Sequence, residues 1–284
     1  MCFWANSKIK IQKLENLIFY IFLFAIPFQT RLVLRSWGIG FNEWNSAFFY
    51  FTDILLILVL IIWAFRTYST DERCGGGPKP TLRDASSKEV TRPAKQTDSG
   101  VLKILISFVI FSGISVFFAL NKSLALFRFL KLIEFSLLFL YLQNTKIDFK
   151  KVYLVLIGSG IFQSLIAISQ FIRQESLGLK FLGESPLGLN NPGVATFLDF
   201  AGAKFIRAYG TFPHPNILAV FLFVCIFLLV RLFLEKRFNL KFFLPIFGIL
   251  NLGLILTFSR TVILVYLVSI IIFALKNNKF RFMS

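Results

Sequence analysis

The sequence contains few residues of the types that bind metal ions or form disulfide frameworks. Its 284 residues include one histidine and three cysteines. Cys2 lies near the start, Cys74 in a polar stretch and Cys225 within an apolar run. This spacing matches neither a disulfide framework nor a metal-ligand motif. We therefore assign no chemistry to the cysteines and expect neither a metal ion nor another cofactor.

Acidic residues are also scarce, because 14 Asp and Glu stand against 31 Lys and Arg and leave a formal net charge of +17. In a soluble protein such an excess would suggest nucleic acid as a partner. No basic helix and no aromatic RNA-binding motif occurs outside the apolar runs. We therefore expect no nucleic-acid partner and attribute the positive charge to the sidedness of a membrane protein.

Apolar residues, by contrast, are abundant. They make up 56% of the chain and include 38 Phe, against roughly 45–50% in soluble proteins. Many fall in runs of roughly 20 residues, which are long enough to cross the hydrocarbon layer as helices. The predicted spans are 14–34, 48–65, 102–120, 124–142, 152–172, 217–234, 242–258 and 261–275. The sequence thus predicts an all-α, polytopic transmembrane helix bundle of about eight spans, with residues 1–284 in a single transmembrane domain.

The basic residues predict the orientation of this bundle. The first span follows Lys8, Lys10 and Lys13, and no small-residue cleavage site comes after it, so we expect an uncleaved helix. With a cytoplasmic N-terminus, the inner connections carry more Lys and Arg than the outer ones, as the positive-inside rule requires. We predict cytoplasmic N- and C-termini, a mobile cytoplasmic linker at 66–101 and an extracytoplasmic loop at 173–215.

The most informative stretch is Arg207–Asn216, RAYGTFPHPN, directly before the sixth span. Its two prolines fix φ and disfavour helix in the residue before each, so we expect His214 in an extended turn at the start of the helix. Asn216 is then expected to cap that helix. The pattern fits a substrate site that includes Tyr209, and it fits a rigid helix start with no further role equally well.

A second feature is the short Ser259-Arg260 connection between the last two spans. On the predicted topology, Arg207 and Arg260 both lie at the outer surface. The planar guanidinium group matches phosphate oxygens, so two arginines that converge on one cavity would suit a pyrophosphate. The alternative is that each arginine binds lipid headgroups.

Polar side chains within the spans form a third group. Arg128, Lys131 and Glu134 are spaced three apart and share one helical stripe. Ionisable groups at membrane depth usually face the bundle interior or a water-filled cavity. We predict a Lys131–Glu134 pair, which leaves Arg128 as a candidate for binding an anionic substrate. Gln163 and Gln170 share a face two turns apart, where sugar binding and hydrogen bonding between helices are both possible roles.

At these residues the sequence resembles the O-antigen ligase and O-antigen polymerase superfamily of bacterial membrane glycosyltransferases. The resemblance rests on Arg207–Asn216, on Thr257–Arg260 and on Gln163–Gly178, and it is strongest over 163–275. It implies an all-helical enzyme of cell-surface polysaccharide biosynthesis, located in the bacterial plasma (inner) membrane. It further implies transfer of a glycan from a polyprenyl-diphosphate donor to a glycan or lipid acceptor, among membrane lipids and without a metal.

By this resemblance, Arg207 and Arg260 are candidate catalytic residues that hold the pyrophosphate and stabilise charge on the leaving group. The candidate substrate-binding residues are Tyr209, His214, Asn216, Arg128, Lys131, Gln163 and Gln170. Members of the family continue through further spans and a large outer loop with a functionally important histidine. We therefore expect the 284 residues to be a lipid-linked glycan transferase or an N-terminal portion of one. A transporter or flippase of lipid-linked glycan and a catalytically inactive fragment are the alternatives, and ligase and polymerase are not distinguished.

Overall fold

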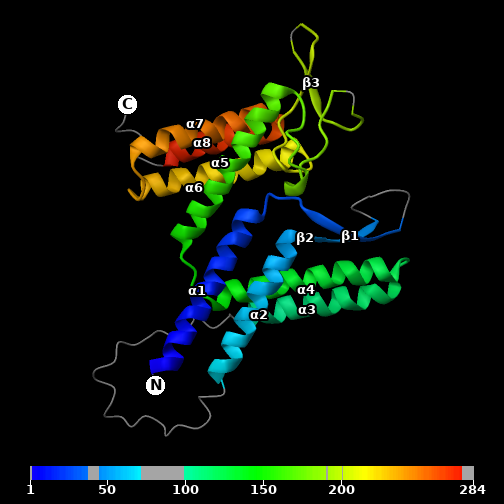
Figure 1. Ribbon diagram of the computed structural model, residues 1–284, viewed down its shortest axis with the longest axis vertical. Helices are drawn as coiled ribbons and strands as arrows, with labels where there is room; N and C mark the ends of the chain where they lie inside the picture. Colours follow the sequence, from blue (N-terminus) through cyan, green and yellow to red (C-terminus); the bar gives the residue numbers. More distant parts are fainter. Residues whose placement is uncertain (1, 38–44, 72–98, 190, 200, 277–284) are drawn as a thin grey trace. The chain divides into compact units, whose positions relative to one another are not determined.

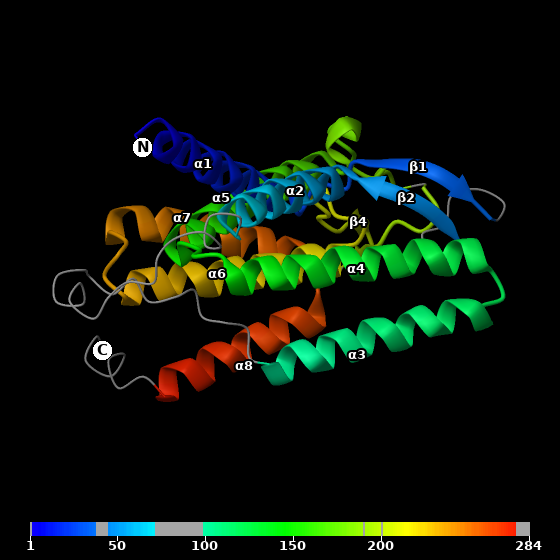
Figure 2. The same cartoon turned by 90° about the horizontal axis from the view of Figure 1, so that it is seen from below.

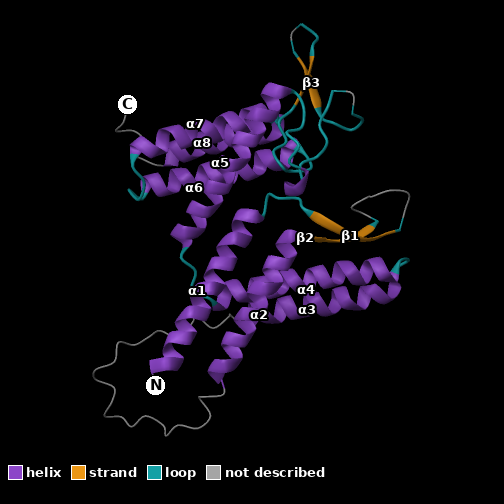
Figure 3. Cartoon of the chain, viewed as in Figure 1, coloured by secondary structure: helices purple, strands orange, loops and turns teal. Residues whose placement is uncertain are grey.

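Helices make up most of the chain in the computed structural model (Figures 1 and 3). The structure describes residues 2–37, 45–71, 99–189, 191–199 and 201–276. The α-helices of this part are α1 Cys2–Ala25, α2 Phe51–Asp71, α3 Ser99–Ser115, α4 Lys122–Asn144, α5 Phe149–Arg173, α6 Pro215–Leu234, α7 Leu240–Leu256 and α8 Arg260–Lys276. The prediction of a predominantly helical chain is confirmed.

Four of the described helical segments are long and apolar enough to cross a membrane. They are Phe51–Tyr68 of α2, Gly100–Phe118, α5 and α6; the second of them combines α3 with the 3₁₀ turn Val116–Phe118. Helices α7 and α8 are apolar but shorter, with 17 residues each. These segments identify the chain as a membrane protein.

Short strands replace helix at the end of the first predicted span and at the start of the second. Strand β1 (Arg31–Ser36) pairs with β2 (Ser46–Tyr50), so the prediction of helix at 31–34 and 48–50 is wrong. Helix α1 ends at Ala25 because Pro27 lacks a backbone donor and disfavours helix in the residue before it. The predicted loop 173–215 contains an antiparallel hairpin of β3 (Thr196–Leu198) and β4 (Lys204–Ile206), which the all-α prediction does not include.

The chain divides into two compact units. Residues 1–22 and 32–148 form the N-terminal unit, and residues 23–31 and 149–284 form the C-terminal unit. Residues 66–71 of the predicted linker continue helix α2. The linker residues 72–98 and the tail 277–284 lie outside the described residues.

In the N-terminal unit, α3 and α4 lie side by side as an antiparallel pair (Figures 1 and 2), and α2 packs on α4. Asn121 begins α4 by accepting a hydrogen bond from the Leu124 N–H. The predicted Lys131–Glu134 pair is present, with Nζ and Oε2 3.0 Å apart. The Lys131 ammonium group also pairs with Asp53, from the first turn of α2. A cation between two carboxylates offsets much of the cost of burying these charges.

In the C-terminal unit, helices α5, α6 and α7 pack against one another around a core of aliphatic side chains that includes Leu222. Two glycines allow this close packing. A Cβ on Gly253 would lie 2.6 Å from Ser164 Oγ, and one on Gly160 would lie 2.8 Å from Cys225 Sγ. The three-helix core fixes the end of α5, the start of α6 and the α7–α8 turn, which together carry the candidate site.

Candidate functional site

The segment before α6 is held against α5 by two buried glutamines. Gln170 Oε1 accepts hydrogen bonds from the backbone N–H groups of Tyr209 and Gly210, at 3.2 and 2.8 Å. Gln163 Oε1 accepts from the Thr211 N–H at 2.9 Å, and its Nε2 donates to the Thr211 hydroxyl at 2.9 Å. The glutamine amides thereby give the segment the backbone partners that a neighbouring strand would otherwise supply.

Gln170 also connects this segment to Glu184, a buried carboxylate in the 173–215 loop. Its Nε2 donates to the Gly210 carbonyl and to Glu184 Oε1, both at 2.8 Å. Glu184 further accepts hydrogen bonds from the backbone N–H groups of Leu177 and Leu179, at 2.7 and 2.6 Å. These contacts satisfy the carboxylate without a cation. The hydrogen bond between Gln170 and Glu184 therefore anchors the 173–215 loop to helix α5.

Gly210 makes the close approach to α5 possible. It has a φ of +62°, and a Cβ there would lie 2.6 Å from Gln163 Oε1. The next residue is fully buried, and the Thr211 hydroxyl donates to the Pro27 carbonyl at 2.8 Å. The backbone between Tyr209 and Thr211 is thus held by the glutamines of α5 on one side and by the Pro27 carbonyl on the other.

Arg207 is held by neutral acceptors. Its Nε donates to the Thr257 carbonyl at 2.6 Å, and its Nη2 donates to Asn216 Oδ1 at 2.7 Å. Thr257 is the C-cap of α7, and helix C-termini attract positive charge. Partial burial, together with the positive charge of Arg260, lowers the pKa of the Arg207 guanidinium from its ordinary value. The Arg207 guanidinium has no carboxylate partner among the described residues; both of its acceptors are neutral oxygens.

His214, and not Asn216, caps helix α6. The histidine backbone is extended, with φ −150° and ψ 140°, as the flanking prolines predict. Its Nδ1 accepts a hydrogen bond of 3.2 Å from the Asn216 N–H. Burial, and secondarily the charge of Arg207, lowers the pKa of His214. The predicted capping role of Asn216 is wrong because its side chain turns to Arg207 instead.

The α7–α8 turn places Arg260 at the start of α8. Phe258 adopts a φ of +47° in this turn, a conformation that costs a bulky residue about 1–3 kcal/mol. Its ring stacks on Phe197 of strand β3, with the centroids 3.8 Å apart. Phe171 of α5 lies 5.9 Å from Phe258, between ring centroids. The aromatic contacts stabilise the strained turn and fix the β3–β4 hairpin beside it.

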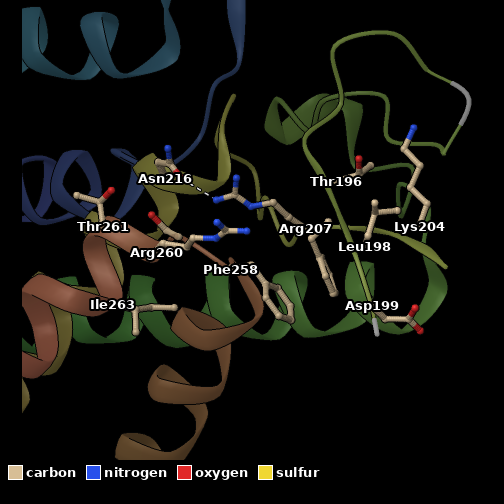
Figure 4. A pocket seen from close by; sticks show the side chains of 12 residues that line it. Thr196, Leu198, Asp199, Lys204, Arg207, Asn216, Phe258, Arg260, Thr261 and Ile263 are labelled. Atoms are coloured by element: carbon tan, nitrogen blue, oxygen red, sulfur yellow. Dashed lines mark hydrogen bonds between the residues drawn. The ribbon is translucent and has the colours of Figure 1, made fainter. Parts of the chain in front are cut away.

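These elements line an open cavity of about 1060 Å³ (Figure 4). Its lining residues come from the hairpin and Arg207 directly after it, from the start of α6, and from the α7–α8 turn with the first residues of α8. They are Thr196, Phe197, Leu198, Asp199, Lys204, Arg207, Asn216, Phe258, Ser259, Arg260, Thr261 and Ile263. In Figure 4 the guanidinium groups of Arg207 and Arg260 lie next to each other, close to Asn216.

The cavity is positively charged. Lys204, Arg207 and Arg260 contribute cations, and Asp199 is the one carboxylate among the lining residues. Asp199 Oδ1 accepts hydrogen bonds from the N–H groups of Ala201 and Ala203, at 2.9 and 2.7 Å, and so stabilises the hairpin turn. The Arg260 guanidinium makes no hydrogen bond or ion pair with any described residue. The arrangement can bind an anion with several oxygen atoms.

The structure brings together only part of the predicted site. Arg207, Asn216 and Arg260 line one cavity, while Arg128 and Lys131 belong to the N-terminal unit. The remaining predicted residues, Tyr209, His214, Gln163 and Gln170, do not line the cavity. The two glutamines are buried hydrogen-bonding residues, and the Tyr209 hydroxyl accepts from the Ala195 N–H at 2.6 Å. His214 serves as the helix cap.

Several lining residues have no signal in the sequence that would reveal them. The hairpin residues Thr196, Phe197 and Lys204 occupy a loop with no recognisable motif, and only their pairing in space brings them to the arginines. Phe258 could have been predicted from the sequence, because it lies between Thr257 and Arg260, in a stretch that carries the family resemblance. Its left-handed backbone is what makes it part of the site.

Comparison with protein-family models, with curated proteins and with solved structures finds no match to this chain. The resemblance to the O-antigen ligase and polymerase superfamily therefore rests on the quoted motifs alone.

Proposed function

We propose that this chain is a membrane glycan transferase of the O-antigen ligase and polymerase type, or a portion of one. Its donor would be a glycan linked through diphosphate to a polyprenyl lipid, and its acceptor a second glycan or a lipid-borne sugar. The observation that carries the proposal is the convergence of Arg207 and Arg260 on one cavity. Both guanidinium groups lack a carboxylate partner among the described residues, so their charge is available to a diphosphate.

In the proposed reaction, an acceptor hydroxyl oxygen attacks the anomeric carbon of the donor sugar. The bond between that carbon and the diphosphate oxygen breaks, the electron pair stays on the diphosphate, and the hydroxyl proton is released. Negative charge on the leaving group increases as the bond breaks. Fixed guanidinium groups stabilise this charge, because they are oriented before the reaction begins. Arg207 suits this role because Thr257 and Asn216 already orient its side chain.

The proposal includes a topology. We propose that the described helices belong to a bundle of about eight spans in the bacterial plasma membrane, with both termini in the cytoplasm. Residues 173–215 and the cavity then face outward, where a lipid-linked glycan would be displayed. Cysteine labelling in intact cells tests this orientation at exposed positions. Lys204→Cys should react with a membrane-impermeant reagent and Lys146→Cys should not, while the opposite pattern would exclude the proposed sidedness.

Arg260 offers the sharpest test of the function, because its guanidinium makes no contact on which the described structure depends. Arg260→Lys keeps the charge but removes the planar donor pair. We expect this variant to bind a bare polyprenyl diphosphate roughly tenfold more weakly, which corresponds to about 1.4 kcal/mol. Donor binding by the purified protein in nanodiscs gives the measurement, followed by transfer in membranes that contain donor and acceptor.

The matched control is Arg173→Lys, because Arg173 is exposed at the end of α5 and does not line the cavity. This variant should bind the lipid diphosphate like the wild type. Equal binding by Arg260→Lys and the wild type would exclude a diphosphate clamp and favour the binding of lipid headgroups. Tight binding with no transfer to any acceptor would favour a transporter of the same lipid.

A further inference from the structure

The cavity extends well beyond its two arginines, toward the β3–β4 hairpin. On this side it is lined by Thr196, Phe197, Leu198, Asp199 and Lys204. In Figure 4 Thr196, Leu198, Asp199 and Lys204 lie to the right of Arg207, on the side away from Asn216 and Thr261. The cationic part and the hairpin part are thus two chemically different regions of one cavity.

The hairpin is fixed in place more firmly than its short strands alone would allow. Two-stranded hairpins are marginally stable by themselves. Here the ring of Phe197 stacks on Phe205 across the strand pair and on Phe258 of the α7–α8 turn, with centroid distances of 5.7 and 3.8 Å. At its base, the Ile206 N–H donates to Gln174 Oε1 at 2.6 Å. The hairpin is therefore a fixed wall of the cavity.

The chemistry of this wall suits a sugar. Thr196, Leu198 and Lys204 share one face of the hairpin, because Leu198 pairs with Lys204 and side chains alternate along a strand. Leu198 gives this face apolar surface, and the Thr196 hydroxyl and the Lys204 ammonium give it polar groups. Neither polar group makes a hydrogen bond to a described residue. Binding sites for small polar molecules combine apolar walls with a few such groups, which fix the orientation of the ligand. A pyranose ring presents the matching surface of C–H groups and hydroxyls.

We propose that the hairpin side of the cavity is a subsite for the sugar that adjoins the diphosphate. This inference rests on the proposed function, because the diphosphate must lie at Arg207 and Arg260 for the sugar to reach the hairpin. The lipid chain then leaves on the side of Ile263, in helix α8, whose following residues Leu264 and Val265 are exposed and apolar. The hairpin would discriminate among donors by their first sugar.

The test compares two ligands on one variant. Thr196→Val with Lys204→Ala removes both polar groups and retains the aromatic stack, and Val is well suited to a strand. The ligands are a polyprenyl diphosphate and the same lipid carrying one N-acetylhexosamine or one hexose. Because Lys204 also contributes charge to the cavity, the measured quantity is the difference between the two ligands: we expect the double variant to weaken the binding of at least one sugar-bearing lipid fivefold or more beyond any change for the bare diphosphate.

Lys180→Ala is the matched control, because Lys180 is an exposed loop lysine that does not line the cavity. Unchanged binding of every sugar-bearing lipid by the double variant would overturn the subsite, and so would an equal loss for the bare and the sugar-bearing lipids. Failure of the proposed function gives a different result, namely that Arg260→Lys binds the bare diphosphate as well as the wild type does.

Discussion

The Nη2 group of Arg207 donates a hydrogen bond of 2.7 Å to Oδ1 of Asn216, the second residue of helix α6. Because this acceptor is a neutral amide, it orients the guanidinium without neutralising it. The same asparagine donates its backbone N–H to His214. Through these two hydrogen bonds, Asn216 connects the cap of helix α6 to the Arg207 guanidinium in the cavity.

Asn216→Asp should weaken anion binding although it preserves the geometry. The aspartate would still accept from Arg207, but its negative charge would repel a diphosphate. We expect roughly tenfold weaker binding of polyprenyl diphosphate, or about 1.4 kcal/mol, with thermal stability unchanged or raised, since acidic residues suit a helix N-terminus. Asn216→Ala is the control and should show a smaller loss of binding. Equal losses in the two variants would contradict an electrostatic role.

Gln170→Leu should destabilise the protein strongly, because it leaves several buried groups without hydrogen-bond partners. The Tyr209 and Gly210 N–H groups and the Gly210 carbonyl all bond to this amide, and each such loss costs about 1–3 kcal/mol. Thermal unfolding in detergent should show a clear decrease in midpoint. Ser169→Ala, at an exposed position on the same helix, should unfold like the wild type. A stable Gln170→Leu variant would show that α5 does not hold the segment.

Gly253→Ala should destabilise the three-helix core, whereas Gly248→Ala on the same helix should not. A Cβ at position 253 would lie 2.6 and 2.9 Å from the side-chain atoms of Ser164, while none lies within 4 Å at position 248. Overpacking typically costs about 1–3 kcal/mol, and alanine is favoured over glycine in a helix by about 1 kcal/mol. Unfolding midpoints of both variants measure the difference. Equal unfolding midpoints for Gly253→Ala and Gly248→Ala would contradict the close packing of α7 on α5 at Gly253.

The His214 cap should make stability depend on pH. Its neutral Nδ1 accepts the Asn216 N–H, and the pKa of His214 in the fold is lowered from 6.5 by burial and then by Arg207. The unfolded chain therefore binds the proton more readily, so the contribution of the cap is present above pH 6.5 and declines as the pH falls below it. His214→Asn keeps a capping acceptor that does not titrate.

Unfolding midpoints between pH 7.5 and about pH 5 should fall more steeply in the wild type than in His214→Asn. Since the sequence contains one histidine, a difference in slope reports on this residue. Parallel profiles for the two proteins would exclude the cap as a titrating element.

The local features of this protein follow from the sequence alone. Apolar runs predict the helices, the prolines around His214 predict its extended backbone, and the spacing of Lys131 and Glu134 predicts their ion pair. Each depends on steric restriction or on helical periodicity over a few residues. These interactions need no knowledge of distant parts of the chain.

Tertiary structure decided what the local pattern leaves open. Gln170 meets Gly210 across 40 positions, and Phe197 meets Phe258 across a longer stretch of chain. The sequence shows that a buried polar residue on a helix requires a hydrogen-bond partner. It does not show which residue is the partner, because that depends on how separate elements pack. The same reason explains why His214 rather than Asn216 caps α6: Arg207, fixed by the end of α7, provides the Asn216 side chain with a charged donor.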